Sequence, residues 1–369
     1  MATPEVALRN DDDLPIRLGV IGAGWFASRR HLPEAPSRSD IELVAICRRD
    51  AGARAAIAAH FELSDSQSFA DWEQMLDSAS LDAVLIATPN NMHYTLAKEC
   101  IERGLHVLLE KPMTITSADA WNLVSLAATH KRTLSVALNP PYWAHCHRMK
   151  HALQTTEMGS LESASIYWTG SAAYVFGRGP APDKLPGIVP PTQYRADPEL
   201  NGGGYFIDGG SHLVSELLWV TSRRAVTVSC IMDSTPTDMR NLLTVVLDNG
   251  AVCTINSIGD SHYSARRVWN VFGASGGVMT VTGFEFETTI AIEGAEIQRF
   301  KEADLPPVSS PLTNFCDAIR GTGKLYSPSE HGAHVVDVVE AAYESARSGT
   351  VVKIPDRRQS LSSAGSPTE

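Results

Sequence analysis

The spacing of apolar positions changes near Asn139 and divides the chain into two halves. Before Asn139, short apolar runs alternate with segments of helical periodicity. This pattern predicts strands at Leu18–Ile21, Ile41–Cys47, Ala83–Ala87, Leu105–Leu109 and Thr133–Leu138, and helices at Ala51–His60, Asp71–Leu76, Met92–Arg103 and Ser117–His130. Apolar strands separated by crossover helices are typical of a parallel, doubly wound α/β sheet.

Short strands at hairpin spacing dominate the second half. The predicted strands are Leu161–Thr169, Ala225–Asp233, Leu242–Leu247, Ala251–Ile258, Val268–Phe272, Val278–Val281, Phe284–Ile292 and Glu296–Phe300. Helices are predicted at Tyr142–Leu153, Gly204–Val220, Pro311–Ile319 and Glu330–Ser348. Strands in series, joined by turn signals such as Asn249-Gly250, predict a large open, mainly antiparallel sheet.

Composition and charge exclude several classes of protein. Of 369 residues, 43% are hydrophobic, and 31 Lys and Arg stand against 42 Asp and Glu, a net charge of −11. An acidic chain without a basic tract does not bind nucleic acid, and no apolar stretch predicts a membrane span or a signal peptide. The 6 cysteines are scattered without a CxxC pair, which favours a reduced, cytoplasmic protein.

A glycine turn follows the first strand, with the sequence Gly22-Ala23-Gly24-Trp25-Phe26-Ala27. In such a GxGxxA turn the first glycine permits the tight turn and the second lets the backbone approach a pyrophosphate. The alanine lets the next helix pack closely, with its N-terminus facing the phosphates. A strand before the turn and a helix after it favour dinucleotide binding over an ordinary turn.

The end of the second strand bears on the choice of dinucleotide. An acid here binds the ribose hydroxyls of NAD, whereas an arginine accepts the 2′-phosphate of NADP. Arg48 and Arg49 follow Cys47, and Asp50 is expected to cap the next helix. We therefore favour NADP(H), while NAD(H) stays possible because two arginines also suit a solvated strand end.

Three further motifs follow in order along the chain. Thr88-Pro89-Asn90, with His93, follows the third strand, and Glu110-Lys111-Pro112 follows the fourth. The third motif runs from Gly203-Gly204 through Asp208 to His212. Together with the glycine turn, these motifs resemble the Gfo/Idh/MocA family of glucose–fructose oxidoreductase and inositol dehydrogenase, and the resemblance extends from about Ile16 to Pro355.

The resemblance implies an N-terminal Rossmann domain at 16–138 and a C-terminal α+β domain at 139–355, the latter binding substrate and forming a homodimer or homotetramer through its sheet. We expect a flexible tail at 1–15, a disordered tail at 356–369, and a C-terminal helix that packs back on the Rossmann domain. The implied activity is NAD(P)-dependent oxidation or reduction of a sugar, sugar derivative or cyclitol. The expected cofactor-binding residues are Gly22, Gly24, Trp25, Phe26, Arg48, Arg49, Thr88, Pro89, Asn90, His93, Glu110 and Lys111.

Lys111, Asp208 and His212 are the candidate catalytic residues. Hydride transfer at a carbinol carbon needs a proton acceptor on the hydroxyl and a cation for the developing alkoxide. His212 suits the proton transfer, Lys111 supplies the cation, and Asp208, four residues before His212, shares its helix face. The glycines around this pair, including Gly209 and Gly210, suggest that the backbone approaches a ligand.

The candidate substrate-binding residues are Lys111, Tyr142, Trp143, Tyr194, Arg195, Asp208 and His212. The His145-Cys146-His147 run with His151 suggests a zinc site, but no second ligand group accompanies it, so no metal is expected. Two other functions stay open: a glycoside-cleaving enzyme that uses bound NAD(P) for transient oxidation and elimination, and a non-catalytic dinucleotide-sensing regulator.

Overall fold

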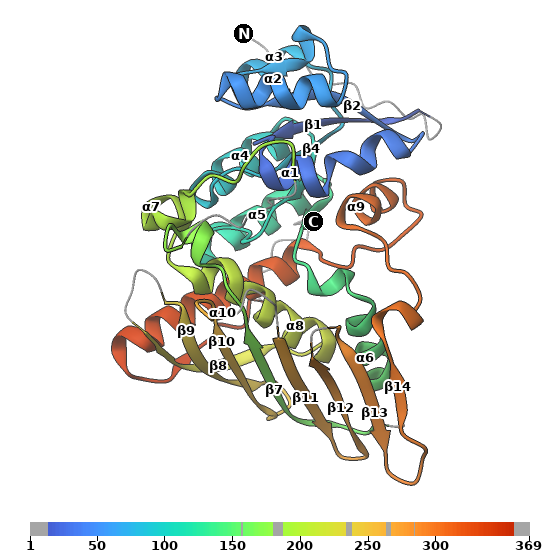
Figure 1. Ribbon diagram of the computed structural model, residues 1–369, viewed down its shortest axis with the longest axis vertical. Coiled ribbons are helices and arrows are strands. Elements are labelled where there is room, and N and C mark those ends of the chain that lie inside the picture. Colours follow the sequence, from blue (N-terminus) through green and yellow to red (C-terminus); the bar gives the residue numbers. More distant parts are fainter. Residues whose placement is uncertain are drawn as a thin grey trace, which may run out of the picture. The chain divides into compact units, whose positions relative to one another are not determined.

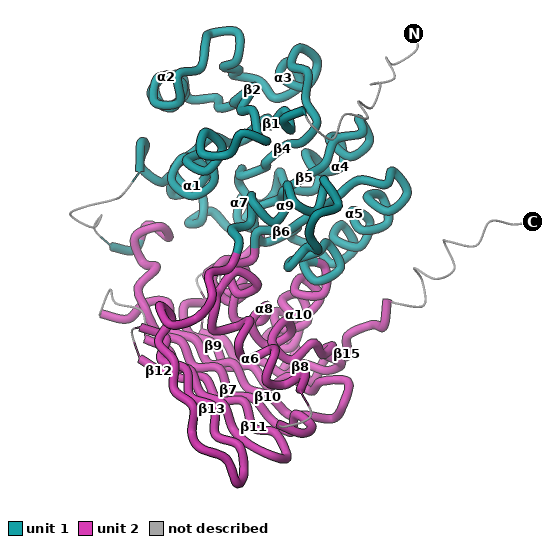
Figure 2. The backbone as a smooth tube through the Cα atoms, turned by 90° about the vertical axis from the view of Figure 1, so that its right-hand side faces the viewer, with its two compact units in different colours: residues 1–137, 178–201, 309–332 teal, residues 138–177, 202–308, 333–369 magenta. Residues whose placement is uncertain are grey.

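The computed structural model describes residues 14–155, 158–179, 187–233, 238–262, 267–283 and 285–357. The chain forms two compact units (Figure 2). The first holds the described residues of 1–137, 178–201 and 309–332, and the second those of 138–177, 202–308 and 333–369. Most of both predicted tails, at 1–13 and 358–369, lies outside the described residues. Among the described helices, none combines the length and apolarity needed to cross a membrane.

The first unit contains a parallel sheet of six strands. They are β1 (Ile16–Ile21), β2 (Ile41–Cys47), β3 (Ser68–Phe69), β4 (Ala83–Ile86), β5 (His106–Leu109) and β6 (Leu134–Val136), in the order β3-β2-β1-β4-β5-β6. The crossover helices are α1 (Trp25–Arg30), α2 (Ala51–His60), α3 (Trp72–Ser78), α4 (His93–Glu102) and α5 (Ser117–Thr129). This strand order is that of a Rossmann fold, so the prediction is confirmed.

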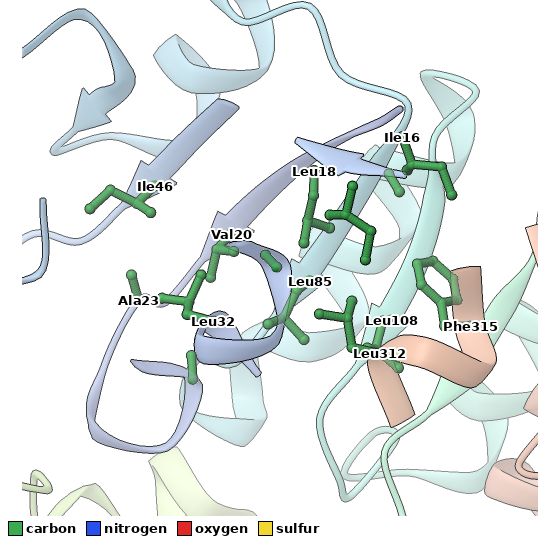
Figure 3. Close-up of a cluster of buried hydrophobic side chains, with 14 of the residues drawn as sticks. Ile16, Leu18, Val20, Ala23, Leu32, Ile46, Leu85, Leu108, Leu312 and Phe315 are labelled. Carbon is green, nitrogen blue, oxygen red and sulfur yellow. The ribbon is translucent and has the colours of Figure 1, made fainter. Parts of the chain in front are cut away.

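The core of the first unit includes a helix from far along the chain. In α9 (Pro311–Ile319), the side chains of Leu312 and Phe315 are fully buried in the same apolar cluster as Leu108 of β5 (Figure 3). Arg38 adds an ion pair to Asp317 at 3.1 Å. Burial of two large apolar side chains stabilises this association by about 3–6 kcal/mol, taking about 1.5–3 for each.

The second unit contains a sheet of nine strands. They are β7 (Leu161–Thr169), β8 (Ala225–Met232), β9 (Arg240–Leu247), β10 (Val252–Ile258), β11 (Arg267–Ala274), β12 (Gly277–Gly283), β13 (Glu287–Ile292), β14 (Gln298–Phe300) and β15 (Val352–Lys353). Their order is β14-β13-β12-β11-β7-β10-β9-β8-β15. All neighbours are antiparallel except β7 and β10, so the predicted mainly antiparallel sheet is confirmed as a mixed one.

The two faces of this sheet differ. Three helices, α6 (Ala144–Gln154), α8 (Ser211–Thr221) and α10 (Ser329–Ser348), lie along one face (Figure 1). On the other face the strands present Ile231, 73% exposed, Trp269, 63% exposed, and Leu242 and Val252. The strands accordingly alternate between buried and exposed positions, as in β10.

The predicted helix Gly204–Val220 is not one regular α-helix. It begins with a π-helical turn at Phe206–Gly210, and α8 follows from Ser211. A Cβ on Gly209 would lie 2.4 Å from the ring of Tyr205, and one on Gly210 would lie 2.1 Å from the ring of Phe206. The two glycines make room for aromatic rings of the preceding turn, so packing within the chain accounts for them without a ligand.

Candidate cofactor and active site

The glycine turn after β1 is shaped by backbone contacts at the ends of β2 and β4. Gly22 has φ +85°, and a Cβ there would lie 2.6 Å from the carbonyl group of Ala87. The amides of Gly22 and Ala23 donate to the carbonyl oxygen of Cys47 at 3.0 and 3.1 Å. Only glycine combines this conformation with so close an approach, which holds the turn against the carboxyl ends of the neighbouring strands.

Arg48 lies over the second glycine of the turn. Its Nη1 donates to the carbonyl oxygen of Ala23 at 3.3 Å, and a Cβ on Gly24 would lie 2.8 Å from the same nitrogen. Its Nε is buried and has no hydrogen-bond partner among the described residues. Arg49 is exposed, and Asp50 caps α2 through Ala53 at 2.7 Å, as predicted. The first arginine is therefore the one that borders the glycine turn.

Trp25 and Phe26 are the first residues of α1, directly after the turn. Their rings meet edge to face with centroids 6.2 Å apart, and the guanidinium of Arg29 lies 4.6 Å from the Trp25 ring. A Cβ on Gly187 would lie 2.8 Å from that indole. The segment that starts at Gly187 therefore passes close to the glycine turn within the first unit.

The turn after β4 carries Thr88, Pro89 and Asn90. Oγ1 of Thr88 is buried and has no partner in the described part of the chain. Nδ2 of Asn90 donates to the backbone and side-chain oxygens of Asn201 at 2.9 and 3.0 Å, and Tyr194 donates to Oδ1 of Asn90 at 3.3 Å. Asn90 thus fastens the later segment to this turn, and it brings Tyr194 close to the β4 end.

His93 joins the turn after β4 to the turn after β5. Its Nδ1 lies 2.7 Å from the carbonyl oxygen of Pro112, and its Nε2 lies 3.1 Å from that of Thr88. The side chain is fully buried, and desolvation lowers the pKa of the imidazole. A neutral imidazole has one N–H and donates to one of these carbonyls at a time, so His93 links the two turns through a single hydrogen bond and close packing.

The Glu110-Lys111 pair at the end of β5 has a partner that sequence analysis missed. Nε2 of the buried His31 lies 2.7 Å from Oε1 of Glu110, while Oε2 accepts from the amide of Lys111 at 3.2 Å. Lys111 is 9% exposed. No local pattern connects position 31 with position 110, because only the fold brings them together.

In the second unit, His212 stands at the start of α8, and its ring is held by the backbone. Its Nδ1 accepts from the amide of Asn139 at 3.4 Å, which places the ring proton on Nε2. Asp208, in the preceding π turn, accepts a hydrogen bond from Ser211 at its backbone oxygen, at 3.0 Å. Both side chains are half-buried.

Asp238 and Tyr343 hold the segment that leads into this turn. The carboxylate of Asp238 accepts from the amides of Phe206 and Gly204 at 2.7 and 3.2 Å, and from the hydroxyl of Tyr343 at 2.7 Å. Desolvation raises the pKa of Asp238. Neither residue was predicted as functional, because both lie far from Asp208 in the sequence and in no recognisable motif.

The remaining predicted substrate residues fall in different places. Tyr142 is buried in a short 3-10 turn, and Trp143 stacks on His145 at 5.4 Å in the second unit. In the first unit, the guanidinium of Arg195 lies 4.6 Å from the Tyr194 ring. The candidate residues divide between the two units: Arg48, Thr88, Glu110, Lys111 and Tyr194 belong to the first, and Tyr142, Trp143, Asp208 and His212 to the second.

Comparison with known proteins decides the family. Residues 16–138 match the GFO/IDH/MocA oxidoreductase family with its NAD-binding Rossmann fold, and residues 147–279 match the GFO/IDH/MocA C-terminal domain. The chain belongs to the GFO/IDH/MocA family. It is accordingly an NAD(P)-dependent oxidoreductase, and the resemblance inferred from the motifs is confirmed.

Three relatives illustrate the family. A dTDP-3,4-didehydro-2,6-dideoxy-α-D-glucose 3-reductase from Saccharopolyspora spinosa is 28% identical, with 84% of this chain and 89% of the relative covered. An NADP(+)-dependent D-xylose 1-dehydrogenase from Haloarcula marismortui is 24% identical over 93% of this chain and 94% of its own. A levoglucosan dehydrogenase solved with NADH and levoglucosan has a TM-score of 0.79 at 17% identity, over 93% of this chain and 100% of its own, and shares the fold.

Proposed function

We propose that the protein transfers a hydride between a nicotinamide cofactor and a carbinol or ketone carbon of a sugar, sugar derivative or cyclitol. The observation that carries the proposal is the arrangement of the first unit. There the glycine turn, the Thr88 turn and the Glu110-Lys111 turn follow three adjacent parallel strands, β1, β4 and β5. Ligands of open α/β sheets bind at these strand ends, and relatives of this chain include sugar reductases and dehydrogenases.

The glycine turn fits a dinucleotide. A Cβ at Gly22 would meet backbone at 2.6 Å, so the turn is built for close approach. Nε of Arg48 and Oγ1 of Thr88 are buried and have no hydrogen-bond partner among the described residues. Both are groups that can donate a hydrogen bond to a phosphorylated ligand. We propose NADP(H) as the preferred cofactor because Arg48, not an acid, borders this turn; a preference for NAD(H) is the alternative outcome.

We propose that Lys111, His212 and Asp208 act on one substrate oxygen. The bound nicotinamide supplies or accepts the hydride. During ketone reduction, the imidazolium form of His212 donates its Nε2 proton to the carbonyl oxygen and becomes neutral, and the Lys111 ammonium stabilises the negative charge that develops there. Asp208 stabilises the positive charges of His212 and Lys111, or it binds a neighbouring hydroxyl of the substrate. Tyr142, Trp143, Tyr194 and Arg195 are proposed to contact the rest of the substrate.

The contact of His212 with Asn139 bears on proton transfer. When Nε2 exchanges a proton with the substrate oxygen, the ring alternates between the imidazolium and the neutral form with its proton on Nδ1. In both forms Nδ1 carries a proton, so it gives up the hydrogen bond that it accepts from the amide of Asn139. The contact therefore favours neither oxidation nor reduction.

The deciding experiment is a nicotinamide-absorbance screen of the purified full-length chain. NADPH and NADH are each offered with keto-sugars and keto-cyclitols, and NADP⁺ and NAD⁺ with aldoses, polyols and cyclitols. We expect turnover with at least one ketone and faster turnover with NADPH. Glycoside cleavage without any net absorbance change would support the elimination enzyme instead, and cofactor binding without turnover of any class would support the regulator.

We also propose that the exposed face of the second sheet pairs with a second copy of the chain. The outward positions Ile231, Leu242, Val252 and Trp269 are large and apolar, which is unusual for a face left in water. Light scattering should report a dimer or tetramer, and Trp269→Glu should shift it toward the monomer. A monomeric wild type at micromolar concentration contradicts this part of the proposal.

A reducing, cytoplasmic setting is proposed for the enzyme because its 6 cysteines are all buried thiols. Burial raises the pKa of Cys100 and Cys316 to about 12, which suppresses the reactive thiolate. Thiol titration of the denatured protein, isolated without reductant, should find all six cysteines as free thiols. A lower number of free thiols contradicts the proposal.

A further inference from the structure

A cluster of three potential metal ligands lies inside the second unit, apart from the residues assigned to catalysis. His145 and Cys146 stand in the first turn of α6, and Glu216 comes from the middle of α8. Their exposed fractions are 1%, 0% and 2%, and one donor atom of each lies within 4.8 Å of the others. An imidazole, a thiol and a carboxylate that converge inside a protein are a typical ligand set for a transition metal.

The surroundings orient two of the three side chains. Nδ1 of His145 lies 2.7 Å from Oε2 of Glu302, so Nε2 is the ring nitrogen that remains to bind a metal. Asn270 donates to Oε1 of Glu216 at 2.7 Å. A carboxylate on the far nitrogen of a histidine, and an amide on a carboxylate, are the outer contacts that usually orient metal ligands.

The histidine ring is also held rigidly by aromatic side chains. Phe286 stacks on it with ring centroids 5.0 Å apart and planes at 10°, and Trp143 stacks at 5.4 Å. These rings restrict the imidazole and exclude water from its faces. Within the described residues, no hydrogen bond joins His145, Cys146 and Glu216 to one another. Three donors thus converge without satisfying each other.

The charges of the cluster favour a cation. Desolvation raises the pKa of Glu216 and of Cys146, because burying either anion without compensation is costly. A divalent metal ion would neutralise one thiolate and one carboxylate, and the contact of His145 Nδ1 with Glu302 would remain. Metal binding would then release the protons of the thiol and of any protonated Glu216.

We propose that Nε2 of His145, Sγ of Cys146 and a carboxylate oxygen of Glu216 bind a divalent metal ion of the zinc class. Thiolate and imidazole ligands select zinc over calcium and magnesium, which take oxygen ligands. Three protein ligands leave one tetrahedral position for water. Bonds of about 2.0–2.3 Å require the donors to close in modestly from their present spacing.

The proposed ion would tie α6 to α8. Glu216 stands four residues after His212, one turn along α8. Fixing Glu216 therefore restrains the helix whose first turn carries His212. The proposal does not depend on the proposed reaction, since metal content is measured without substrate or cofactor.

The test uses the full-length protein, stripped with a chelator and reloaded with cobalt(II) or zinc(II). Wild type should bind one equivalent by elemental analysis, and the cobalt form should show a thiolate charge-transfer band in the near ultraviolet. Cys146→Ser should abolish that band. Cys253→Ser is the matched control, because Cys253 is equally buried in the same unit but lies on β10 away from the cluster, and it should keep the band.

Glu216→Gln is a second test variant, in case Cys146→Ser does not fold. The glutamine can still accept the hydrogen bond from Asn270, so the fold should be kept. It should keep the band but bind cobalt at least about tenfold more weakly, the scale expected for changing a ligand or its outer contacts. If wild type takes up no more cobalt or zinc than Cys146→Ser, or if the band survives Cys146→Ser, the proposal is overturned. His145–Glu302 and Asn270–Glu216 would then be two separate structural contacts.

Discussion

The two sheets of this protein differ in how their residues reach functional positions. In the first unit, β4 is buried at every position, and its motif Thr88-Pro89-Asn90 follows after one intervening residue, Ala87. In the second unit, the segment with Asp208 and His212 is held by Asp238 and Tyr343, which come about 30 and 135 residues later. The first candidate site consists of turns at adjacent strand ends, fastened by the contacts His31–Glu110 and Asn90–Asn201. The second lies on a helical segment that depends on Asp238 and Tyr343 to hold it.

This difference explains where glycine is needed. Gly22 is required because backbone from a neighbouring strand end lies against it. Gly209 and Gly210 are required because aromatic side chains of their own helix fold over them. The same residue type therefore marks a close approach of backbone in one unit and of aromatic rings in the other, and the sequence pattern alone does not distinguish them.

The largest expected effect comes from removing one candidate catalytic residue from each unit. His212→Ala should lower turnover by about 10²–10⁴-fold, the usual contribution of a general acid–base group. Lys111→Ala should cost at least as much, because it removes the charge opposite the developing alkoxide. Steady-state turnover with the best substrate of the screen measures both.

Cofactor affinity, measured by fluorescence titration, is the control for these variants. Neither change should weaken NADPH binding greatly, because the turn at Gly22 and Arg48 stays intact. If both variants keep near-normal turnover, the chemistry does not involve these residues and the regulator becomes the better hypothesis.

A second prediction concerns Arg48 alone. Arg48→Asp should weaken NADPH binding by about 1.5–3 kcal/mol, the scale of a hydrogen bond to a charged group, and should reverse or flatten the preference over NADH. Arg49→Asp makes the same charge change one residue later, at an exposed side chain, and should have a smaller effect. If calorimetry finds that the wild type binds NADH more tightly than NADPH, Arg48 does not confer a preference for NADPH.

Local sequence signals predicted the first unit well. β2, α2 and α9 begin and end at the predicted residues, because apolar runs, an Asp N-cap and a proline at the start of a helix act within a few positions. The glycine turn is recognisable for the same reason. Signals of this kind do not connect distant residues, so the His31–Glu110 contact was missed.

The second unit shows the limit of such signals. Alternation predicted its strands, but not that β7 enters the middle of the sheet parallel to β10. The expectation of no metal rested on the lack of a second ligand group near His145. Glu216 could be such a group. His145 and Cys146 are neighbours on α6, whereas Glu216 lies on α8, so the three residues form no recognisable spacing in the sequence.

A third prediction tests the glycines directly. Gly210 has φ −65°, so Gly210→Ala introduces no backbone strain, only a clash of its Cβ with the Phe206 ring. We expect a loss of about 1–3 kcal/mol in the free energy of unfolding, as for overpacking a core. Gly52→Ala in α2 is the matched control, since its Cβ meets nothing closer than 3.7 Å.

Gly52→Ala should stabilise the protein by up to about 1 kcal/mol, because alanine is the better helix former. Chemical unfolding followed by circular dichroism measures both variants. Equal stability of the two would contradict the packing explanation of the π turn at Phe206–Gly210.

The smallest effect is expected from a buried histidine of the first unit. Burial, followed by the charge of Arg132, lowers the pKa of His106 to about 4. Its Nδ1 accepts from the amide of Thr133 at 3.0 Å, a bond that the neutral ring makes and a protonated ring loses. The unfolded chain, with an ordinary pKa of about 6.5, binds this proton first as the pH falls.

The contribution of His106 to stability is therefore complete above about pH 6.5 and is lost as the pH falls toward about 4. Because the side chain is partly exposed, we expect a loss of about 1–2 kcal/mol across that range rather than the full value of the shift. His106→Asn keeps an acceptor for Thr133 but does not titrate, so its urea midpoint should fall less between about pH 7.5 and 4.5. His60→Asn removes an exposed histidine from the same unit and should follow wild type. If His106→Asn instead loses stability in parallel with wild type, the acid sensitivity arises from other groups, and burial at the start of β5 does not control it.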